Sequence, residues 1–429
     1  MMTTPPSSSS EQASAEKTDL LQYARAIHER VLTLDSHIDF APADLISERN
    51  YTQRLDTQFN LPKMIEGGLD GLFFIVFVAQ TRESQNAEAL KAPGFERAYH
   101  RALEKFDAVH HFTHAIAPDK IELAFTAVDA RRIHAAGKKI AFMGVENGYA
   151  LGEDLRLVQE FHDRGARYLS LTHNGHNQLA DSHTGEREGW KWHGVSPLGE
   201  EVIAAMNRLG MMVDVSHASK NAMMQIAALS SAPIMASHSA VRALCDVSRN
   251  LDDEQLLALQ KIGGVIQVVA YNGFIKTTKA DSPERFSALA ALRKEYDMPE
   301  TNGPGQRARL LSALKEWPDA RRHQFETRLA EIDKQYPGDE PATVKDFVDH
   351  IDYAVNLLGI DHVGISSDFD GGGGLIGWDD ASETFAVTLE LVRRGYNEEQ
   401  IAKLWSGNLL RVMEEVEQIA RELQSKSLA

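Results

Sequence analysis

Residues 31–39 read Val-Leu-Thr-Leu-Asp-Ser-His-Ile-Asp, an apolar run that ends in polar side chains. The apolar part is continuous rather than alternating, which is typical of a strand buried on both faces. Seven further runs of this kind follow along the chain. The eight predicted strands are Val31–Leu34, Gly71–Ala79, Ile140–Val145, Tyr168–Leu171, Met211–Val215, Pro233–Ala236, Gly264–Ala270 and His362–Ile365.

Helix-like segments separate most of these runs, so predicted strands and helices alternate. Eight strands in regular alternation with helices favour a closed (β/α)8 barrel, the TIM barrel, over an open doubly wound α/β sheet. No G-x-G-x-x-G motif follows the first strand, which argues against a dinucleotide-binding fold. The predicted helices include Asn86–His110, Ala127–Ala136, Asp154–Arg164, Ser196–Leu209, Lys220–Ala228 and Asp252–Lys261.

The gap between the seventh and eighth strands is far longer than one connecting helix requires. It is charged, and helical patterns occur near Phe286–Tyr296 and Arg307–Tyr336. We predict a helical insertion at 275–345 that caps the barrel rather than forming a separate domain. A final helical pair, Glu383–Arg394 and Glu398–Leu423, closes the chain.

The N-terminal residues 1–16 are Pro- and Ser-rich at their start, with neither a basic start nor an apolar stretch. They are predicted to be a disordered tail rather than a secretory signal. Residues 17–429 are predicted to form a single barrel domain. The longest apolar run, Leu72–Ala79, is far too short to span a bilayer, so no membrane partner is expected.

The chain is acidic, because 45 Lys and Arg residues stand against 62 Asp and Glu residues and give a net charge of −17. Such a charge repels phosphate backbones, so no nucleic-acid partner is expected. The single cysteine, Cys245, can form neither an internal disulfide nor a cysteine-based metal site. We therefore expect a reducing compartment and a cytoplasmic protein.

Metal-capable side chains follow six of the eight predicted strands. In a barrel of this type the catalytic groups come from the carboxyl ends of the strands, so these side chains are expected to converge on one site. Histidines with carboxylates are typical ligands of a divalent transition metal, whereas magnesium and calcium prefer oxygen ligands. The residues are His37 and Asp39 after the first strand, Glu146 after the third, His173 after the fourth, His217 after the fifth, His238 after the sixth, and Asp368 with Asp370 after the eighth.

Seven short motifs contain these residues or follow them: Asp35-Ser-His-Ile-Asp39, Gly144-Val-Glu-Asn147, Leu171-Thr-His-Asn174, Asp214-Val-Ser-His217, Ser237-His-Ser-Ala240, Ser248-Arg-Asn-Leu-Asp-Asp253 and Gly364-Ile-Ser-Ser-Asp-Phe-Asp-Gly371. Their order resembles the amidohydrolase superfamily of metal-dependent hydrolases. Because a glutamate rather than a lysine follows the third strand, the chain is most similar to the membrane (renal) dipeptidase family. The resemblance extends from about residue 30 to about residue 420.

The resemblance implies a binuclear site with two zinc ions per chain. His37 and Asp39 would hold one ion, His217 and His238 the other, and Glu146 would bridge both. A metal-bridging hydroxide would attack the peptide carbonyl, with Asp368 as the general acid/base. His173 would stabilise the oxyanion and contact the substrate.

The resemblance also implies the substrate class. Arg249 would bind the free C-terminal carboxylate of a dipeptide, a role that suits a bidentate guanidinium. Tyr271 and Asp370 are further candidates for contacts with the substrate, and Arg242 is the less favoured arginine nearby. The family implies tolerance of D-residues at the C-terminal position (L-Xaa-D-Xaa), and a homodimer.

Three other functions stay open at this point, one of them an ester- or lactam-directed enzyme whose dipeptidase activity is incidental. Another binuclear amidohydrolase, such as an N-acyl amino acid amidase or a lactonase, would leave simple dipeptides unhydrolysed. A non-catalytic binding protein would require that at least one metal-ligating residue be absent from the sequence. The segment 183–193, rich in polar and aromatic residues, is equally consistent with a substrate-contacting loop and with a surface loop.

Overall fold

The computed structural model describes most of the chain, including every predicted strand. The predicted tail at 1–16 lies outside the described residues, as do residues 86–92 and 307–313 of two predicted helices. The described residues are 19–80, 93–279, 281–298, 314 and 317–427.

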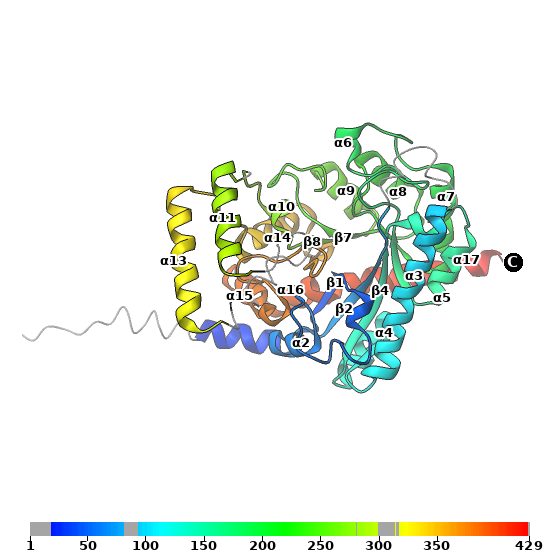
Figure 1. Cartoon of the computed structure of the whole chain (residues 1–429). Coiled ribbons are helices and arrows are strands. Elements are labelled where there is room, and N and C mark those ends of the chain that lie inside the picture. The colour runs from blue at the N-terminus through cyan, green and yellow to red at the C-terminus, as the bar shows by residue number, and fades with distance from the viewer. Residues whose placement is uncertain (1–18, 81–92, 280, 299–313, 315–316, 428–429) are drawn as a thin grey trace, which may run out of the picture.

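Eight parallel strands form a nearly closed barrel in the order in which they occur along the chain, which confirms the predicted TIM barrel (Figure 1). The last strand lies beside the first, where Asp39 N donates to Phe369 O at 2.9 Å and Asp368 N donates to His37 O at 3.1 Å. The barrel strands are β1 (Leu34–Ile38), β2 (Gly71–Phe77), β4 (Lys139–Glu146), β5 (Ala166–Ser170), β6 (Met212–Asp214), β7 (Met235–Ser239), β8 (Val265–Val269) and β9 (Val363–Ser366).

One further short strand, β3 (Ile121–Leu123), pairs in parallel with the start of β4 and lies off the barrel path. It was not predicted. Its three residues alternate apolar and charged, and a stretch of this length carries too weak a pattern to identify a strand.

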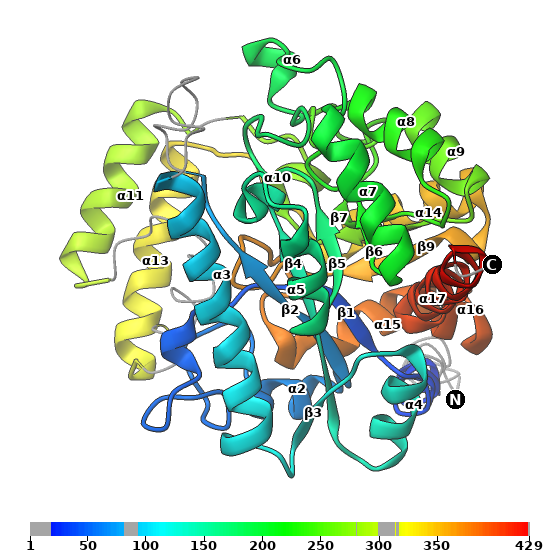
Figure 2. The same ribbon diagram turned by 90° about the vertical axis from the view of Figure 1, so that its right-hand side faces the viewer.

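Helices surround the strands (Figure 2). The helices predicted from Ser196 and Asp252 begin within one residue of those positions because polar residues cap them: the Ser196 side chain accepts from Gly199 N, and Asp252 forms a capping box with Gln255. The helices around the barrel are α2 (Leu61–Gly67), α3 (Pro93–His111), α4 (Ala127–Ala135), α5 (Arg156–Asp163), α7 (Pro197–Leu209), α8 (Lys220–Leu229), α9 (Asp253–Lys261), α14 (Val344–Leu358), α15 (Phe385–Arg393), α16 (Glu398–Ala402) and α17 (Asn408–Ser427). Short helical turns include α6 (Gly185–Glu188), α10 (Asn272–Ile275) and the π-turn Lys403–Gly407, which separates α16 from α17.

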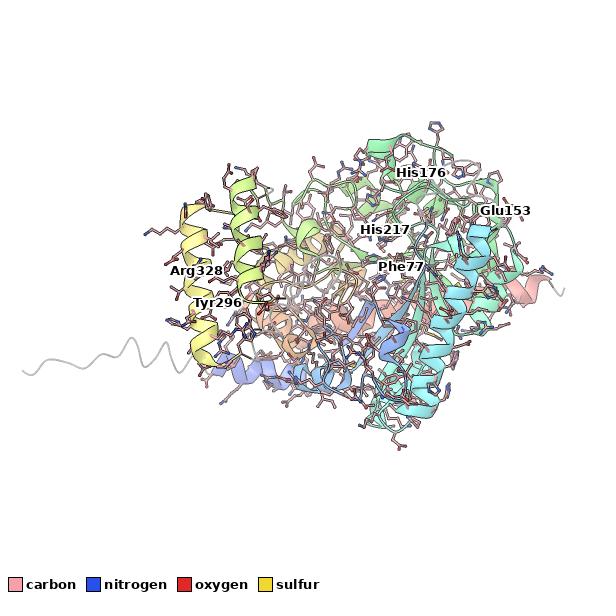
Figure 3. All side chains as sticks on the ribbon, in the orientation of Figure 1. Phe77, Glu153, His176, His217, Tyr296 and Arg328 are labelled. Atoms are coloured by element: carbon pink, nitrogen blue, oxygen red, sulfur yellow. The ribbon has the colours of Figure 1, made fainter. Side chains whose placement is uncertain are left out.

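The predicted insertion between the seventh and eighth barrel strands contains α11 (Pro283–Glu295) and α13 (Asp319–Gln335). The two helices lie side by side at one edge of the molecule (Figure 1), and Tyr296 and Arg328 mark them well away from His217 (Figure 3). They share a small cluster around Leu292 and Phe325 that is separate from the clusters of the barrel. That this pair caps the barrel, rather than forming a separate domain, stays a prediction.

Aromatic side chains from neighbouring strands support the polar end of the barrel. Phe73 stacks on Phe142 with ring centroids 4.7 Å apart, and Tyr168 lies against Phe73 at 5.3 Å. All three are fully buried, so they form a rigid floor beneath the strand ends. Among the described helices, none is long and apolar enough to cross a membrane.

Candidate metal centre

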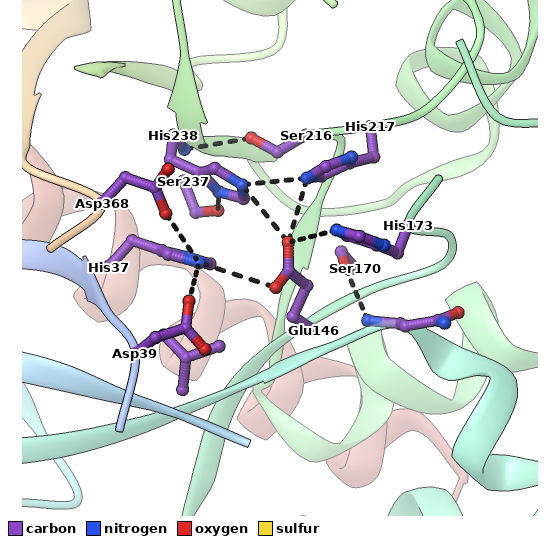
Figure 4. Close-up of polar contacts among 12 residues, drawn as sticks. His37, Asp39, Glu146, Ser170, His173, Ser216, His217, Ser237, His238 and Asp368 are labelled. Carbon is purple, nitrogen blue, oxygen red and sulfur yellow. Dashed lines mark hydrogen bonds and ion pairs between the residues drawn. The ribbon is translucent and has the colours of Figure 1, made fainter. Parts of the chain in front are cut away.

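The predicted ligands converge at the carboxyl ends of the barrel strands (Figure 4). His37 lies in β1 and Asp39 just beyond it, Glu146 is the last residue of β4, and His238 lies in β7. His173, His217 and Asp368 follow β5, β6 and β9. A parallel barrel brings these ends together on one face, which is why residues more than 300 positions apart share one site.

The carboxylate of Glu146 is at the centre of the group, and its two oxygens face different residues. Oε1 lies 3.0 Å from His217 Nε2, 3.3 Å from His238 Nε2 and 4.0 Å from His173 Nε2. Oε2 lies 3.7 Å from His37 Nε2. Burial raises the pKa of Glu146, whereas the surrounding imidazoles, where protonated, would outweigh it and lower the pKa below its usual range.

His37 presents an unprotonated nitrogen to this group. Its Nδ1 donates to the Tyr168 hydroxyl at 3.0 Å, and that hydroxyl donates in turn to Ser36 O at 3.0 Å. Nε2 is buried and has no hydrogen-bond partner among the described residues. It faces carboxylate oxygens of Asp39 at 3.8 Å and Asp368 at 3.9 Å, distances too long for hydrogen bonds. A cation bound between these carboxylates would give His37 Nε2 the partner that it lacks.

His217 and His238 turn their Nε2 atoms toward each other at 3.0 Å. The other nitrogen of each ring is held from outside: His217 Nδ1 donates to Asn174 Oδ1 at 3.1 Å, and His238 Nδ1 donates to Ser237 Oγ at 2.8 Å. The Ser237 hydroxyl donates to Asp214 Oδ2 at 2.6 Å. Each ring therefore carries its proton on Nδ1 and directs an Nε2 lone pair into the site, as metal-binding histidines do.

Burial keeps these imidazoles neutral. It lowers the pKa of His37 to about 4 and lowers the pKa values of His217 and His238 well below the ordinary value. Burial, with repulsion from neighbouring carboxylates, raises the pKa of Asp39 to about 7 and that of Asp368 well above its usual range. Neutral imidazoles beside mutually repelling carboxylates form a donor set that a divalent cation would relax.

The backbone at the site is strained. His217, Asp368 and Asp370 have φ values of 68°, 58° and 58°, in the left-handed region that residues with side chains rarely adopt. Strain of this kind persists where the surrounding structure imposes it and is frequent at functional sites. The chain is also tightly packed at Gly371, where a Cβ would lie 2.4 Å from both Asp368 Oδ1 and Asp39 Oδ2, so no side chain fits at this position.

Gly144 lets Tyr168 reach His37. A Cβ at Gly144 would lie 2.2 Å from the Tyr168 ring, so any side chain would push the ring away. A glycine inside a strand often marks such a close approach. The glycine of the motif Gly144-Val-Glu-Asn147 thus leaves room for the Tyr168 hydroxyl to accept from His37 Nδ1, which keeps the His37 proton on that nitrogen.

A cavity of about 500 Å³ opens onto the group. Asp39, Glu146, His173, His217, His238, Asp368, Asp370 and Tyr271 line it, so the predicted substrate residues Tyr271 and Asp370 lie at the same pocket. His173 is the most open of the histidines at 24% exposed, and its ring packs 4.3 Å from that of His217. Asp370 accepts from Gln58 N at 2.8 Å, which ties it to the wall of the pocket.

Arg249 is only 3% exposed and lies beside His238. Its Nη2 donates to His238 O at 2.8 Å and its Nη1 to Ser239 Oγ at 2.9 Å, while Nε has no partner among the described residues. Each Nη carries a second hydrogen, so the guanidinium keeps donors beyond these two bonds. The less favoured Arg242 instead pairs with Glu186 and Asp246 at the surface.

Sequence reasoning missed the residues that orient the ligands and one that lines the pocket. Lys105 of α3 lies on the cavity wall, with Nζ 3.0 Å from Ile75 O and 3.9 Å from Asp39 Oδ1. Nothing in its helical context marks it. Tyr168 was assigned only to a strand, whereas Ser237 and Asp214 were quoted within motifs without a role.

The residues present fit a metal ion. Three overlapping groups, each with ligand atoms within 4.8 Å of one another, combine His37, Glu146 and His238, then Glu146, His173 and His217, then His37, Asp39 and Asp368. Glu146 is common to two groups, and His37 is common to two. Each group offers the donor atoms of a divalent metal site.

Comparison with known proteins agrees with this chemistry. A model of the family described as membrane dipeptidase (peptidase family M19) matches residues 21–427. The dipeptidase aclJ of Aspergillus oryzae is 29% identical over 406 residues, which cover 92% of this chain and 80% of that protein. The crystal structure of the probable dipeptidase PvdM from Pseudomonas aeruginosa is 35% identical, covers 94% of this chain and 99% of that chain, and has a TM-score of 0.74. A metallopeptidase from Rhodobacter sphaeroides, liganded with a phosphinate mimic of the dipeptide L-Ala-D-Ala, shares the fold at a TM-score of 0.66 and 23% identity, covering 90% of this chain and 99% of that one.

Proposed function

This chain belongs to the membrane dipeptidase family, peptidase family M19, and is a metallo-dipeptidase that hydrolyses peptide bonds, and we propose that it does so with two zinc ions. The observation that carries this proposal is the placement of Glu146. Its Oε1 faces His217 and His238, and its Oε2 faces His37. A carboxylate so placed would bridge two ions.

In this assignment His37 and Asp39 would hold one ion, His217 and His238 would hold the other, and Glu146 would contribute to both. Neutral imidazoles with carboxylates suit zinc better than they suit magnesium or calcium. When bound, the ions would supply hydroxide at neutral pH and polarise the peptide carbonyl.

Asp368 would act as the general acid/base. It lines the cavity, its Oδ1 lies 3.9 Å from His37 Nε2, and it has a ligand atom within 4.8 Å of one of Asp39. From there it would take a proton from the attacking oxygen and give it to the departing amine. His173, the most open histidine of the group, would donate from its ring to the carbonyl oxygen as negative charge develops.

Arg249 would select substrates with a free C-terminal carboxylate. Its guanidinium is held by His238 O, so the C-terminal residue of the substrate would sit at the His217–His238 side of the pocket. Tyr271 and Asp370, which also line the pocket, would contact the substrate. We also propose that D-residues are accepted at the C-terminal position, and the ligand of the Rhodobacter sphaeroides structure makes L-Ala-D-Ala the first dipeptide to test.

The test is amine release from a panel of dipeptides by the zinc-loaded protein. The panel varies C-terminal chirality and includes C-terminal amides and tripeptides as matched controls. Hydrolysis of L-Ala-D-Ala and its L,L counterpart, without hydrolysis of the amides, is the expected result. If protein with two zinc ions per chain releases amine from none of them, the rival functions of N-acyl amino acid amidase or lactonase take precedence. A homodimer and a cytoplasmic location stay predictions, the first to be checked by light scattering.

A further inference from the structure

We propose that His183 is a positioning residue of the metal centre: it holds the Asn174 amide against His217 and ties both to the loop that carries Arg249. This inference rests on the proposed function, in which His217 binds metal and Arg249 binds the substrate carboxylate. His183 lies in the segment 183–193, whose role the sequence left open.

Three hydrogen bonds form a chain outward from His217. His217 Nδ1 lies 3.1 Å from Asn174 Oδ1, the same oxygen lies 2.9 Å from His183 Nε2, and His183 Nδ1 lies 2.9 Å from Ser248 Oγ. The chain thus joins the loops that follow β5, β6 and β7.

The protons along this chain have one consistent arrangement. An amide oxygen only accepts, so His217 Nδ1 and His183 Nε2 must both carry hydrogens. With its hydrogen on Nε2, the neutral His183 ring has a lone pair on Nδ1, which accepts from the Ser248 hydroxyl at 2.9 Å. The result is that His217 keeps its lone pair on Nε2, the atom that faces Glu146 and His238.

The backbone holds His183 beside His217. His183 N donates to His217 O at 2.9 Å, and Ser219 N donates to Asp181 O at 2.9 Å on the other side of the Ser182–Ala218 bridge. The left-handed φ of 68° at His217 makes this support relevant, because a strained residue keeps its conformation only when its neighbours impose it.

The far end of the chain reaches the substrate side of the site. Ser248 directly precedes Arg249, whose guanidinium donates to His238 O and Ser239 Oγ. His183 therefore contacts both a group that orients a metal ligand and the loop of the proposed carboxylate anchor. Loss of the ring should affect the metal affinity, whereas loss of the Ser248 hydroxyl alone should affect substrate binding.

The first measurement is the affinity of each metal equivalent, by competition with a chelator. His183→Phe keeps the ring volume and removes both hydrogen bonds, so it should weaken one equivalent by about 10- to 100-fold, the usual effect of removing a residue that orients a ligand. His183→Gln keeps an N–H donor for Asn174 and should recover part of that affinity. Recovery by Gln is not expected if the ring acts only as packing.

The matched control is His176→Phe. His176 lies on the same connection, and among the described residues its ring nitrogens contact that connection alone: Nδ1 lies 3.1 Å from Ser182 N and 3.0 Å from Asp181 Oδ1, and Nε2 lies 2.7 Å from Gly189 O. Its replacement should lower thermal stability without releasing metal. Equal metal loss in the two Phe variants would mean that any damage to this loop empties the site, and the proposal would fall.

Ser248→Ala tests the link to Arg249. We expect KM for free dipeptides to rise by about 2- to 10-fold, the range of one hydrogen bond, with kcat and both metal equivalents close to those of the wild type. An unchanged KM here, together with unchanged metal affinity in His183→Phe, would overturn the inference.

His217→Ala separates this inference from the proposed function. If His217→Ala retains both equivalents, the ligand assignment itself is wrong. If it loses one equivalent while His183→Phe loses no affinity, the assignment stands and only the role of His183 fails. His183→Gln keeps the test valid should the Phe variant be too unstable to purify.

Discussion

The Nε2 atoms of His217 and His238 lie 3.0 Å apart with no proton to share, because each ring donates its hydrogen from Nδ1 to a partner outside the site. Two lone pairs at this distance repel each other unless a cation lies between or beside them. The partners that impose this arrangement are Asn174 for His217, and Ser237 backed by Asp214 for His238.

Asp214→Asn should reverse the hydrogen-bond relay to His238. Asp214 Oδ1 accepts from Ser216 N and Ser237 N, so in the variant the amide oxygen stays there and the NH2 group replaces Oδ2. That NH2 would donate to Ser237 Oγ, turn the hydroxyl toward His238 Nδ1, and move the ring proton to Nε2. Chelator competition should show one metal equivalent weakened by about 10- to 100-fold.

Asp35→Asn is the isosteric control for that change. Asp35 is also fully buried and accepts backbone hydrogen bonds at strand ends, from His37 N and Ser367 N, but no hydroxyl–imidazole relay leaves its side chain. Its metal affinity should stay near that of the wild type. Equal weakening in both variants would indicate general damage to the barrel end and would contradict the relay.

Asp368→Asn should reduce kcat by at least about 100-fold while both metal equivalents stay bound, because a general acid/base contributes about 10²- to 10⁴-fold and an amide cannot replace it. Metal content by mass spectrometry and turnover of L-Ala-D-Ala are the two measurements. Asp370→Asn, two residues on, should act mainly on KM. Loss of a metal equivalent in Asp368→Asn would show that Asp368 is a ligand instead.

The strand ends were predictable because the fold itself collects them. His37, Glu146 and His238 lie at the ends of apolar runs, and a parallel barrel places the carboxyl ends of all its strands on one face. The capped helices were predictable for a similarly local reason, since Ser196 and Asp252 mark helix starts by their own hydrogen bonds. Local patterns therefore predicted the fold, which the structure confirms, and a group of candidate ligands, which the structure brings together.

Contacts between distant side chains could not be predicted in the same way. Tyr168 reaches His37 only because Gly144 leaves room for its ring, and Lys105 reaches the pocket from the middle of a helix. Neither relation follows from spacing along the chain. The partners of Arg249 are likewise visible only in three dimensions, and they show a side chain already engaged with His238 O rather than one free in the pocket.

Arg249→Met should remove the preference for a free C-terminal carboxylate. In the wild type, amidated dipeptides should react far more slowly than free ones, and in the variant the two rates should approach each other because the anchoring charge is gone. The variant should also lose about 1 to 3 kcal/mol of folding stability, since His238 O and Ser239 Oγ lose their donors.

Arg242→Met is the matched control, because Arg242 lies in the same loop but pairs with Glu186 and Asp246 near the surface. It should keep the wild-type preference for free dipeptides. A variant Arg249→Met that still discriminates against amides would mean that another cation, with Lys105 the first candidate on the cavity wall, recognises the carboxylate.

Asp35 should make the metal-free protein less stable as the pH rises from about 4 to about 7. Burial raises the pKa of Asp35 to about 6 from its ordinary value of 3.8. Between these values the folded state holds a proton that the unfolded state has released, so this contribution to stability is complete below the lower pKa and is lost as pH rises through the higher one. The loss amounts to at most about 3 kcal/mol.

Asp35→Asn does not titrate and should lack this dependence. Urea unfolding of both proteins in the presence of chelator, at intervals between pH 4 and pH 8, gives the free energy of unfolding of each. The difference between wild type and variant should shift in favour of the variant as the pH rises, whatever its value at pH 4. The test is how this difference in unfolding free energy changes with pH, not its value at any one pH. In the variant the amide NH2 group replaces Oδ2, which has no hydrogen-bond partner among the described residues, and this lowers the stability by an amount that does not depend on pH. Parallel curves across the range would show that Asp35 ionises equally in both states.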